Sequence, residues 1–587
     1  MPPIARPTAK RHPRRRTAAL GASALALPLL ATPFASAAVV DEPVRWTAPD
    51  ARVALTPLGS YESGVFDESA AEIVAWYGRG ERIFTVNSQA GTVDVLDASD
   101  PSAPTFVGSL GAEGVVAADG STIPAGAVAN SIAVRADGLA LVAVEHPVKT
   151  EPGWLVVVDA RSTTDATALD EAVLGAVRAG ALPDMVTISE DGRYAVVANE
   201  GEPAEDFSVD PEGSVSVVAL PRRVTAPTQS DVRHADFRAY DAPGALPDGV
   251  RVFGPTLDPE RPVSTNLEPE YVAVVGSTAY VSLQEANAIA VVDLGSARVS
   301  DLWALGTKDH GLPGQGLDPS DRDGAIDIRT VEGLRGMYQP DAIAPLTVRG
   351  RTYLVTANEG DAREWGDYLE PARVKDLGDD GLAPICADSP LAALTGDADL
   401  GRLNVSTASG LSADGTCYEE LYAFGARSIS VWTTDGELVA DTGDAFERVI
   451  AEAVPEFFNS NHSVSNLEGR SDDKGPEPEA ITIGKVQGRT YAFVGLERVG
   501  GVMVVDLTEP TAPEVVGWTN NRDFSVSVED DGVETLSAAG DLGPEGIVFV
   551  PGSQSPTRAP LVIVGSEVSG TTTVFEVESL LGKGSRR

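Results

Sequence analysis

One two-strand pattern recurs along this chain, and this repetition limits the fold more than any other feature. In its full form a Pro-acid pair opens a short apolar segment, a turn follows, and a second apolar segment closes on an acid. The clearest copy runs from Pro183-Asp184 through Asp191-Gly192 to Asn199-Glu200. Two looser copies, at 72–87 and 130–145, precede five copies that begin at Pro183, Pro269, Pro340, Pro478 and Pro544. Similar short units at regular spacing are typical of a repeat architecture.

A third apolar, β-branched segment follows each pair, as strands do after tight turns. These segments are 91–97, 153–159, 213–220, 287–294, 427–432, 501–507 and 570–577. A fourth, less regular strand per unit would complete four-stranded antiparallel blades around a channel. We therefore predict an all-β, seven-bladed β-propeller with loop insertions on one face. A β-sandwich is the alternative, but seven copies of one unit favour radial repetition. Residues 53–58 precede the first unit and can pair with the last blade to close the ring.

The repeat places its acids at one end of the predicted channel. The innermost strand of a blade starts at one face of the disc and the second strand returns to that face. The acids that open the first strands are Asp184, Glu270, Asp341, Glu479 and Glu545, and those that close the second strands are Glu200, Glu285, Glu359, Glu497 and Glu567. We expect these ten carboxylates to surround one mouth of the channel.

Long insertions are expected to cover the same mouth. Residues 362–426 interrupt the fifth unit between its second and third strands, 202–212 form the equivalent loop of the third unit, and 457–477 lead into the sixth. Ligand sites tend to lie where long loops converge on a rigid scaffold. Arg363, Arg427 and His462 lie in or beside these insertions and are candidate ligand contacts.

Carboxylates held close together repel one another unless something neutralises them. A divalent cation is the simplest neutraliser, and oxygen ligands favour calcium or magnesium over zinc. We expect calcium, bound by a subset of the ten acids. The alternative is that each acid accepts backbone N–H bonds and fixes its own turn, with no ion.

A second acidic motif lies outside the repeat. The segment Asp318–Asp327 carries Asp318, Asp321, Asp323 and Asp327 with a glycine at 324, and it resembles a calcium-binding loop. Its spacing departs from that of an EF-hand, because Pro319 takes a position near the first ligand. A solvated acidic loop is the alternative interpretation.

The first 37 residues predict a secretory signal peptide. Six basic residues between Arg6 and Arg16 precede the apolar stretch Ala18–Leu30 and the small-residue site Ala35-Ser36-Ala37. A disordered basic tail is the alternative, and Arg15-Arg16 leaves twin-arginine export open. We expect a linker at 38–50, the propeller at 51–580 and a tail at 581–587, with no C-terminal anchor.

An exported protein lies outside the cytoplasm, and this affects what we expect of its cysteines and of its binding partners. Cys386 and Cys417 are the two cysteines of the chain, and a lone pair in an exported protein usually forms a disulfide. A formal net charge of −43 disfavours nucleic acid and anionic membranes as partners. We find no segment after the leader that is long and apolar enough to span a bilayer. We expect a secreted monomer with an extracellular ligand or protein partner.

Several stretches of the chain resemble the choice-of-anchor I family. The stretches are 182–185, 198–203, 210–214, 267–271, 283–285, 336–341, 357–361 and 543–546. The family includes secreted bacterial proteins, some described as alkaline phosphatase-like, and an animal mesenchyme-specific cell-surface glycoprotein. The resemblance covers about residues 58–578 and implies a secreted or surface-tethered propeller.

Three functions stay open on the sequence. The first is a binding module with an acidic, calcium-binding mouth, and the second is a metal-dependent phosphoesterase, as the resemblance suggests. The third is a scaffold or sensor domain without an ion. Motifs of triad hydrolases, zincins, P-loop proteins and c-type cytochromes are absent from the sequence.

Overall fold

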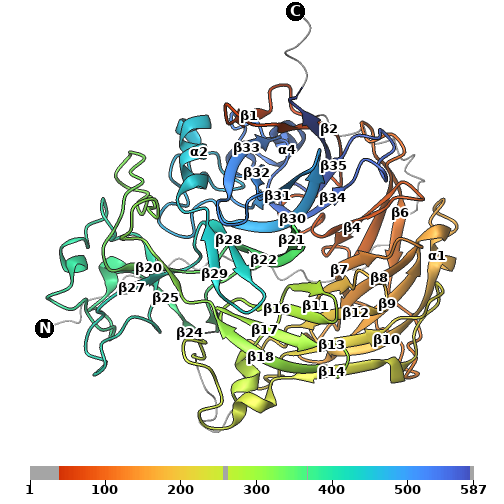
Figure 1. The fold of residues 1–587 in the computed structure, drawn as a ribbon, viewed down its shortest axis with the longest axis horizontal. Coiled ribbons are helices and arrows are strands. Elements are labelled where there is room, and N and C mark those ends of the chain that lie inside the picture. The colour runs from red at the N-terminus through yellow and green to blue at the C-terminus, as the bar shows by residue number, and fades with distance from the viewer. Residues whose placement is uncertain (1–38, 255–261, 367, 582–587) are drawn as a thin grey trace, which may run out of the picture. The chain divides into compact units, whose positions relative to one another are not determined.

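Antiparallel sheets of four or five strands, each built mainly from consecutive strands, dominate the fold (Figure 1). The computed structural model describes residues 39–254, 262–366 and 368–581, all within the compact unit Ser36–Arg587. The first sheet consists of β3 (Val74–Tyr77), β4 (Arg82–Asn87), β5 (Thr92–Asp97) and β6 (Thr105–Gly111). The second consists of β7 (Val128–Val134), β8 (Leu139–Glu145), β9 (Pro152–Asp159) and β10 (Val173–Ala181). The third consists of β11 (Pro183–Ile188), β12 (Tyr194–Asn199), β13 (Ser214–Ala219) and β14 (Val232–Asp236). The fourth sheet consists of β15 (Val272–Val275), β16 (Thr278–Leu283), β17 (Ala288–Asp293) and β18 (Arg298–Ala304). The fifth consists of β21 (Ile343–Val348), β22 (Arg351–Asn358), β28 (Ser428–Thr433) and β29 (Leu438–Asp441). The sixth sheet consists of β30 (Pro478–Val486), β31 (Arg489–Leu496), β32 (Val502–Asp506) and β33 (Glu514–Asn520), to which the N-terminal strand β1 (Val44–Thr47) is added. The last sheet consists of β34 (Pro544–Val550), β35 (Leu561–Ser566), β36 (Thr571–Ser579) and the N-terminal strand β2 (Val53–Glu62).

The apolar core is divided among the spaces between neighbouring sheets. Phe84 of the first sheet packs in one cluster with Val142 of the second, and corresponding clusters join each later sheet to the next. The last cluster joins Ile563 of the final sheet to Ile83 of the first. The strands that open the sheets contact one another in the same cyclic order, ending with β34 against β3. This closed cycle of packed sheets is a β-propeller.

Each sheet packs against a neighbouring sheet on both faces, which explains why the sequences of the second and third strands are continuously apolar instead of alternating. Every residue of β35 and of β28 is buried. A sheet with neighbours on both faces buries both sets of alternating side chains, and β-branched residues suit such a surface.

The ring is closed by an N-terminal strand. β2 pairs antiparallel with β36, from Val53 opposite Ser579 to Glu62 opposite Thr571. The prediction that residues 53–58 pair with the last blade is therefore confirmed, and the pairing extends four residues further.

Residues 44–47 form a strand within the segment expected to be a linker. β1 pairs with β33, which places Trp46 opposite Trp518 and gives that sheet its fifth strand. The short, half-exposed β1 carries no repeat signature, so its partner far along the chain could not be inferred from the sequence.

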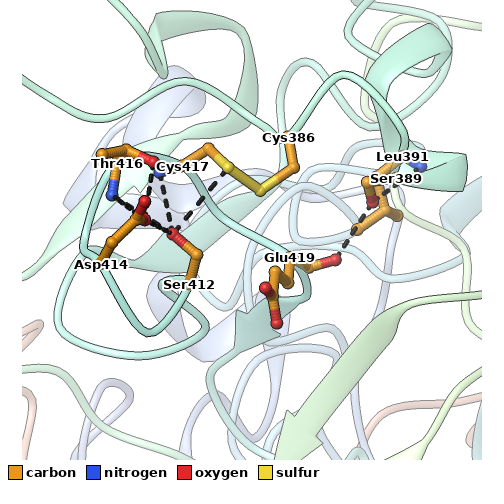
Figure 2. The surroundings of a disulfide bond; sticks show 8 residues. All are labelled: Cys386, Ser389, Leu391, Ser412, Asp414, Thr416, Cys417 and Glu419. Carbon is orange, nitrogen blue, oxygen red and sulfur yellow. Dashed lines mark hydrogen bonds between the residues drawn. A yellow bond between two sulfur atoms is a disulfide. The ribbon is translucent and has the colours of Figure 1, made fainter.

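The long insertion of the fifth sheet folds around its own small core. It contains β23 (Glu364–Trp365), β24 (Tyr368–Leu369), β25 (Pro371–Arg373), β26 (Asn404–Ser406) and β27 (Leu421–Ala423). β27 pairs in parallel with β20 (Leu334–Met337), which pairs with β19 (Thr307–Asp309). The predicted disulfide is confirmed: Cys386 and Cys417 are bonded, with Cα atoms 4.9 Å apart (Figure 2).

Helices are short and lie outside the sheets. They are α1 (Leu169–Ala172), α2 (Ala445–Ala453), α3 (Val528–Asp531) and α4 (Leu536–Ala539). Among the described residues, no helix has the length and apolar character that crossing a membrane requires. The predicted signal peptide at 1–37 and all but the first residue of the predicted tail lie outside the described residues.

Candidate functional site

The acids that open the repeats lie where the first strand of a sheet begins, and three of them sit in irregular pairing. Pro183 pairs with Asn199 but Val186 pairs with Val197, so one extra residue bulges out beside Asp184. The same shift surrounds Glu479 in β30 and Glu545 in β34. A bulge re-aims a side chain away from the regular alternation. These bulges therefore position carboxylates that a regular strand would direct toward a neighbouring sheet.

Backbone hydrogen bonds hold the closing acids beside the opening ones. Glu200 N–H donates to the carbonyl of Leu182 at 2.9 Å, and Glu567 N–H donates to the carbonyl of Gly543 at 2.8 Å. At the fifth sheet Gly360 has φ +93°, and a Cβ there would overlap the backbone of Gly425. Only glycine fits that close approach, which fixes the chain directly after Glu359.

Two adjoining cavities occupy this mouth. The larger, of about 600 Å³, is lined by acids from seven stretches of the chain: Asp184, Glu200, Glu202, Glu270, Glu285, Asp341, Asp361, Glu364 and Asp473. The smaller, of about 330 Å³, shares Asp184, Glu200, Glu202 and Asp341 and adds Glu72, Glu145 and Glu545. Tyr271 lines the smaller cavity and also a cavity of about 900 Å³ between the first strands. The acidic cavities thus adjoin the space that the first strands surround.

Burial and mutual repulsion raise the pKa of most of these carboxyls. Burial, followed by the charges of Glu202 and Glu145, raises the pKa of Asp184 to about 7. Burial, followed by the charge of Asp361, raises the pKa of Glu285 to about 8. The pKa values of Glu270 and Glu479 are raised well above their usual range for the same reasons. Without a cation, part of the mouth is therefore protonated at neutral pH.

Several carboxyls lie within hydrogen-bonding reach of one another. Such pairs are Glu200 with Glu202, Glu270 with Glu285 and Glu479 with Glu545. Glu270 and Glu479 are each 8% exposed, and the Oε2 atom of each receives no hydrogen bond from an N–H or O–H of the protein. A shared proton, a bound cation or water in the cavity can satisfy these oxygens.

One sector of the mouth is neutralised by basic side chains instead. Buried Glu477 accepts from Arg470 at 2.6 Å and lies 3.0 Å from Lys474 and 3.1 Å from Arg498. These cations hold the pKa of Glu477 well below its usual range despite burial. Lys474 also pairs with Glu359, and Arg498 with Glu497. Among ion pairs between described residues, none includes Asp184, Glu200, Glu270 or Glu285, although Lys149 lies 3.6 Å from neighbouring Glu202. Most of the uncompensated charge therefore lies around these four acids.

Two sets of potential ligand atoms converge closely. One carboxylate oxygen each from Glu359, Glu477 and Glu497 lie within 4.8 Å of one another, as do atoms of His462, Glu497 and Glu567. His462 Nε2 lies 3.0 Å from Arg498 Nη1, and burial followed by Arg498 lowers the pKa of His462 to about 3. His462 is therefore a neutral imidazole at this edge of the mouth.

The structure places the other two candidate ligand contacts away from the larger cavity. Buried Arg363 is paired with Glu268. Buried Arg427 pairs with Glu447 at 2.6 Å and donates to backbone carbonyls of the insertion before β30. Both guanidinium groups tie insertions to the propeller.

The site residues expected from the sequence leave out several acids and cations of the mouth. Glu202 and Asp361 each follow an Asn-Glu-Gly triplet, at 199–201 and 358–360, and this shared motif was a usable signal. Glu72 and Glu145 open and close looser copies of the repeat. No repeat pattern marks the remaining residues, which are Glu364, Asp473, Glu477, Lys149, Arg470, Lys474 and Arg498.

One known protein family matches most of this chain, and two known proteins are similar to part of it. The choice-of-anchor I domain matches residues 72–510. Gigasin-3a of Magallana gigas is 33% identical over 194 residues, which cover 31% of this chain and 66% of the relative. The mesenchyme-specific cell surface glycoprotein of Strongylocentrotus purpuratus is 32% identical over 234 residues, covering 35% of this chain and 30% of that protein. The chain thus spans less than two thirds of either relative.

Similar solved structures share little sequence with the chain. Hydrazine synthase of Kuenenia stuttgartiensis has a TM-score of 0.40 and 13% identity, covering 88% of this chain and 99% of that one. Streptogramin B lyase has a TM-score of 0.40 and 10% identity, covering 90% and 98%. The WD40 domain of Toxoplasma gondii coronin has a TM-score of 0.41 and 8% identity, covering 94% and 90%.

Proposed function

Because the chain belongs to the choice-of-anchor I family, we propose that it is an extracellular propeller that binds a ligand through a divalent cation at its acidic mouth. The observation that carries this proposal is the set of carboxylates around one cavity, of which buried Glu270 holds an oxygen that receives no hydrogen bond from the protein. A cation neutralises such a group without requiring protons. The enclosed disulfide and the surface-type family support an extracellular setting.

Calcium suits this mouth better than other common metals. The donors opposite the Lys474–Arg498 sector are carboxylate and amide oxygens, including Gln284 beside Glu285. Calcium takes about 6–8 oxygen ligands in irregular geometry, whereas zinc prefers nitrogen and sulfur in a tetrahedron. The ligands come from Asp184, Glu200, Glu270, Glu285 and Asp341, because the one basic side chain that pairs in this sector, Lys149, pairs with Glu202 instead.

The cavity leaves room for a ligand beside the ion. Trp365 and Phe424 of the long insertion also line the larger cavity. A cation with open coordination positions binds carboxylate, phosphate or hydroxyl oxygens, and the aromatic rings supply apolar contact. The site therefore suits a small polar ligand or an acidic side chain of a partner protein.

The blade count and chain organisation belong to the same proposal. Each large sheet is one blade, giving seven blades over residues 51–580, with a leader at 1–37 that is removed on export. N-terminal sequencing of exported protein should start near Ala38, and a sequence that still begins at Met1 would contradict the leader. An experimental structure with six or eight sheets around the channel would contradict the count.

A metal-dependent phosphoesterase is the second candidate. Arg470, Lys474 and Arg498 line the same cavity as the acids, so a phosphate on a bound cation would have basic groups within reach. Their existing pairing with Glu477 favours the binding module, because a phosphate must compete with that carboxylate.

Elemental analysis followed by a phosphoester assay separates these functions. Protein purified without chelator should contain at least one calcium per chain and should not hydrolyse p-nitrophenyl phosphate. Turnover that chelator abolishes and Arg498→Gln reduces would establish the phosphoesterase instead. Protein that binds no ion, even after dialysis against millimolar calcium, would contradict both.

A further inference from the structure

Three carboxylates of the mouth converge beside the segment that precedes β30, and we refer to them as the three-carboxylate cluster. Glu359 follows β22, Glu497 follows β31 and Glu477 lies directly before β30. One carboxylate oxygen of each lies within 4.8 Å of the others. Glu477 is 0% exposed and Glu497 is 4% exposed, and the Glu497 N–H donates to the Glu477 carbonyl at 2.9 Å. The sheets thus bring three oxygens to distances at which one cation can contact all of them.

The ammonium group of Lys474 lies at this cluster. Lys474 Nζ is 3.0 Å from a carboxylate oxygen of Glu477 and forms a second ion pair with Glu359. Glu497 is paired with Arg498 at 3.0 Å. The lysine therefore neutralises two carboxylates that would otherwise repel each other in a buried place. Its side chain also lines the larger cavity, so the cluster borders that cavity.

The turn that carries Lys474 is held in place without these ion pairs. Gly475 has φ +72°, a conformation that favours glycine. Buried Arg427 donates to the carbonyls of Ser471 and Asp473 at 2.8 and 2.7 Å. Removal of the lysine side chain should therefore leave both the turn and the three carboxylates in position.

The charges around Lys474 indicate what could replace its ammonium group. Four carboxylates and three basic groups are linked in one network of ion pairs: Glu359, Asp473, Glu477, Glu497, Arg470, Lys474 and Arg498. This network has one negative charge in excess. Without the lysine it has two in excess, and one divalent cation would balance them.

We propose that Lys474 is a tethered counter-ion, whose ammonium takes the place of a metal ion at Glu359, Glu477 and Glu497. It excludes metal from this sector, so that the mouth takes cations only among acids that form no ion pair with a described residue, such as Glu270. This inference deepens the proposed function but does not depend on calcium in that other sector, because it concerns different oxygens.

Two variants of the lysine test the inference. Lys474→Ala removes the ammonium and opens the cluster to the larger cavity, whereas Lys474→Met removes the charge but fills most of the same space. Equilibrium dialysis against manganese should find one more ion per chain in Lys474→Ala than in the wild type, and no further ion in Lys474→Met. Lys375→Ala is the control, because Lys375 pairs with Asp397 outside the network, and it should bind manganese as the wild type does.

A small amine supplies a second readout of the same variants. Propylammonium restores an ammonium group and most of the missing stem, so it should raise the melting temperature of Lys474→Ala. Lys474→Met, whose side chain already fills the space, should not respond. A shift of equal size in both variants would show a general salt effect and would contradict the inference.

Manganese-soaked wild-type crystals keep the test independent of whether the variants fold. They should show no anomalous peak between Glu359, Glu477 and Glu497, whereas Lys474→Ala crystals should show one. A peak there in the wild type would overturn the inference, as would a folded Lys474→Ala that binds no further ion. The proposed function fails by a different result, which is the absence of any ion elsewhere in the wild-type mouth.

Discussion

At the residue scale, the proposed cation would compete with protons for the same carboxylate oxygens. The carboxyls of Glu270 and Glu285 lie within hydrogen-bonding reach, and a single proton can hold them together. A calcium ion between such carboxylates must displace that proton, so binding is linked to pH. The raised pKa values of Asp184 and Glu285 set the pH range over which calcium binding is coupled to proton release.

Calcium affinity of the mouth should rise with pH. The pKa of Asp184 is raised to about 7 and that of Glu285 to about 8, so both carboxyls hold protons at pH 6 and release them by pH 9. In the ion-free protein, the free energy of unfolding should fall as pH rises from about 4 to about 8, because the unfolded chain loses these protons near pH 4 and the folded protein holds them up to about pH 8. Calcium titrations by calorimetry at pH 6, 7 and 8 should show at least about a tenfold gain in affinity overall. Equal affinities at all three pH values would contradict proton competition.

The Glu477 network should be essential to folding stability. Glu477 is fully buried and shared by Arg470, Lys474 and Arg498. Glu477→Gln leaves three cations short of their common partner, and breaking a buried ion network costs about 3–5 kcal/mol. Urea unfolding should show this loss, while Glu364→Gln, at an exposed position, should change stability by less than about 0.5 kcal/mol. A Glu477→Gln variant as stable as wild type would show that the network contributes nothing.

At the element scale, strands with a repeat signature could be predicted and irregular segments could not. The apolar second and third strands follow from burial on both faces, as in β28 and β35. The pairing of β1 with β33 joins residues more than 460 positions apart and leaves no local pattern. Likewise Lys474 and Arg498 reach the mouth only through the conformation of the insertion before β30 and the turn after β31, which the sequence does not reveal.

The disulfide should stabilise the insertion rather than the propeller. Cys386 and Cys417 enclose a loop with a sequence separation of 31, and closing such a loop is worth about 3–4 kcal/mol in the chain-entropy model. The insertion has its own apolar core, which includes Leu391 and Leu400. Cys386→Ser with Cys417→Ser should make residues 375–420 sensitive to limited proteolysis, with the propeller fragments intact. Unchanged protease resistance would show that the small core suffices alone.

At the scale of the whole molecule, the propeller converts seven weak copies of a motif into one concentrated site. Each repeat contributes one or two acids, and closure by β2 against β36 brings the last acids beside the first. Like charges destabilise such an assembly unless a ligand of opposite charge binds the folded state. The shared position in the unit predicted that such acids lie close together, and six of the ten line the two cavities: Asp184, Glu200, Glu270, Glu285, Asp341 and Glu545. Whether protons or calcium neutralise them depends on distances that no repeat pattern encodes.

The most direct test of this account is thermal unfolding with and without calcium. A cation bound only by the folded state adds its binding free energy to stability, about 2.7 kcal/mol at a hundredfold excess over Kd. Chelator should lower the melting temperature of the wild-type protein and added calcium should restore it. In Asp341→Asn with Glu545→Gln this shift should disappear. The variant Asp327→Asn serves as a control and should behave as wild type, because Asp327 is exposed, pairs with Arg329 and lines neither acidic cavity. A melting temperature that chelator leaves unchanged, together with no bound ion in the purified protein, would contradict the account.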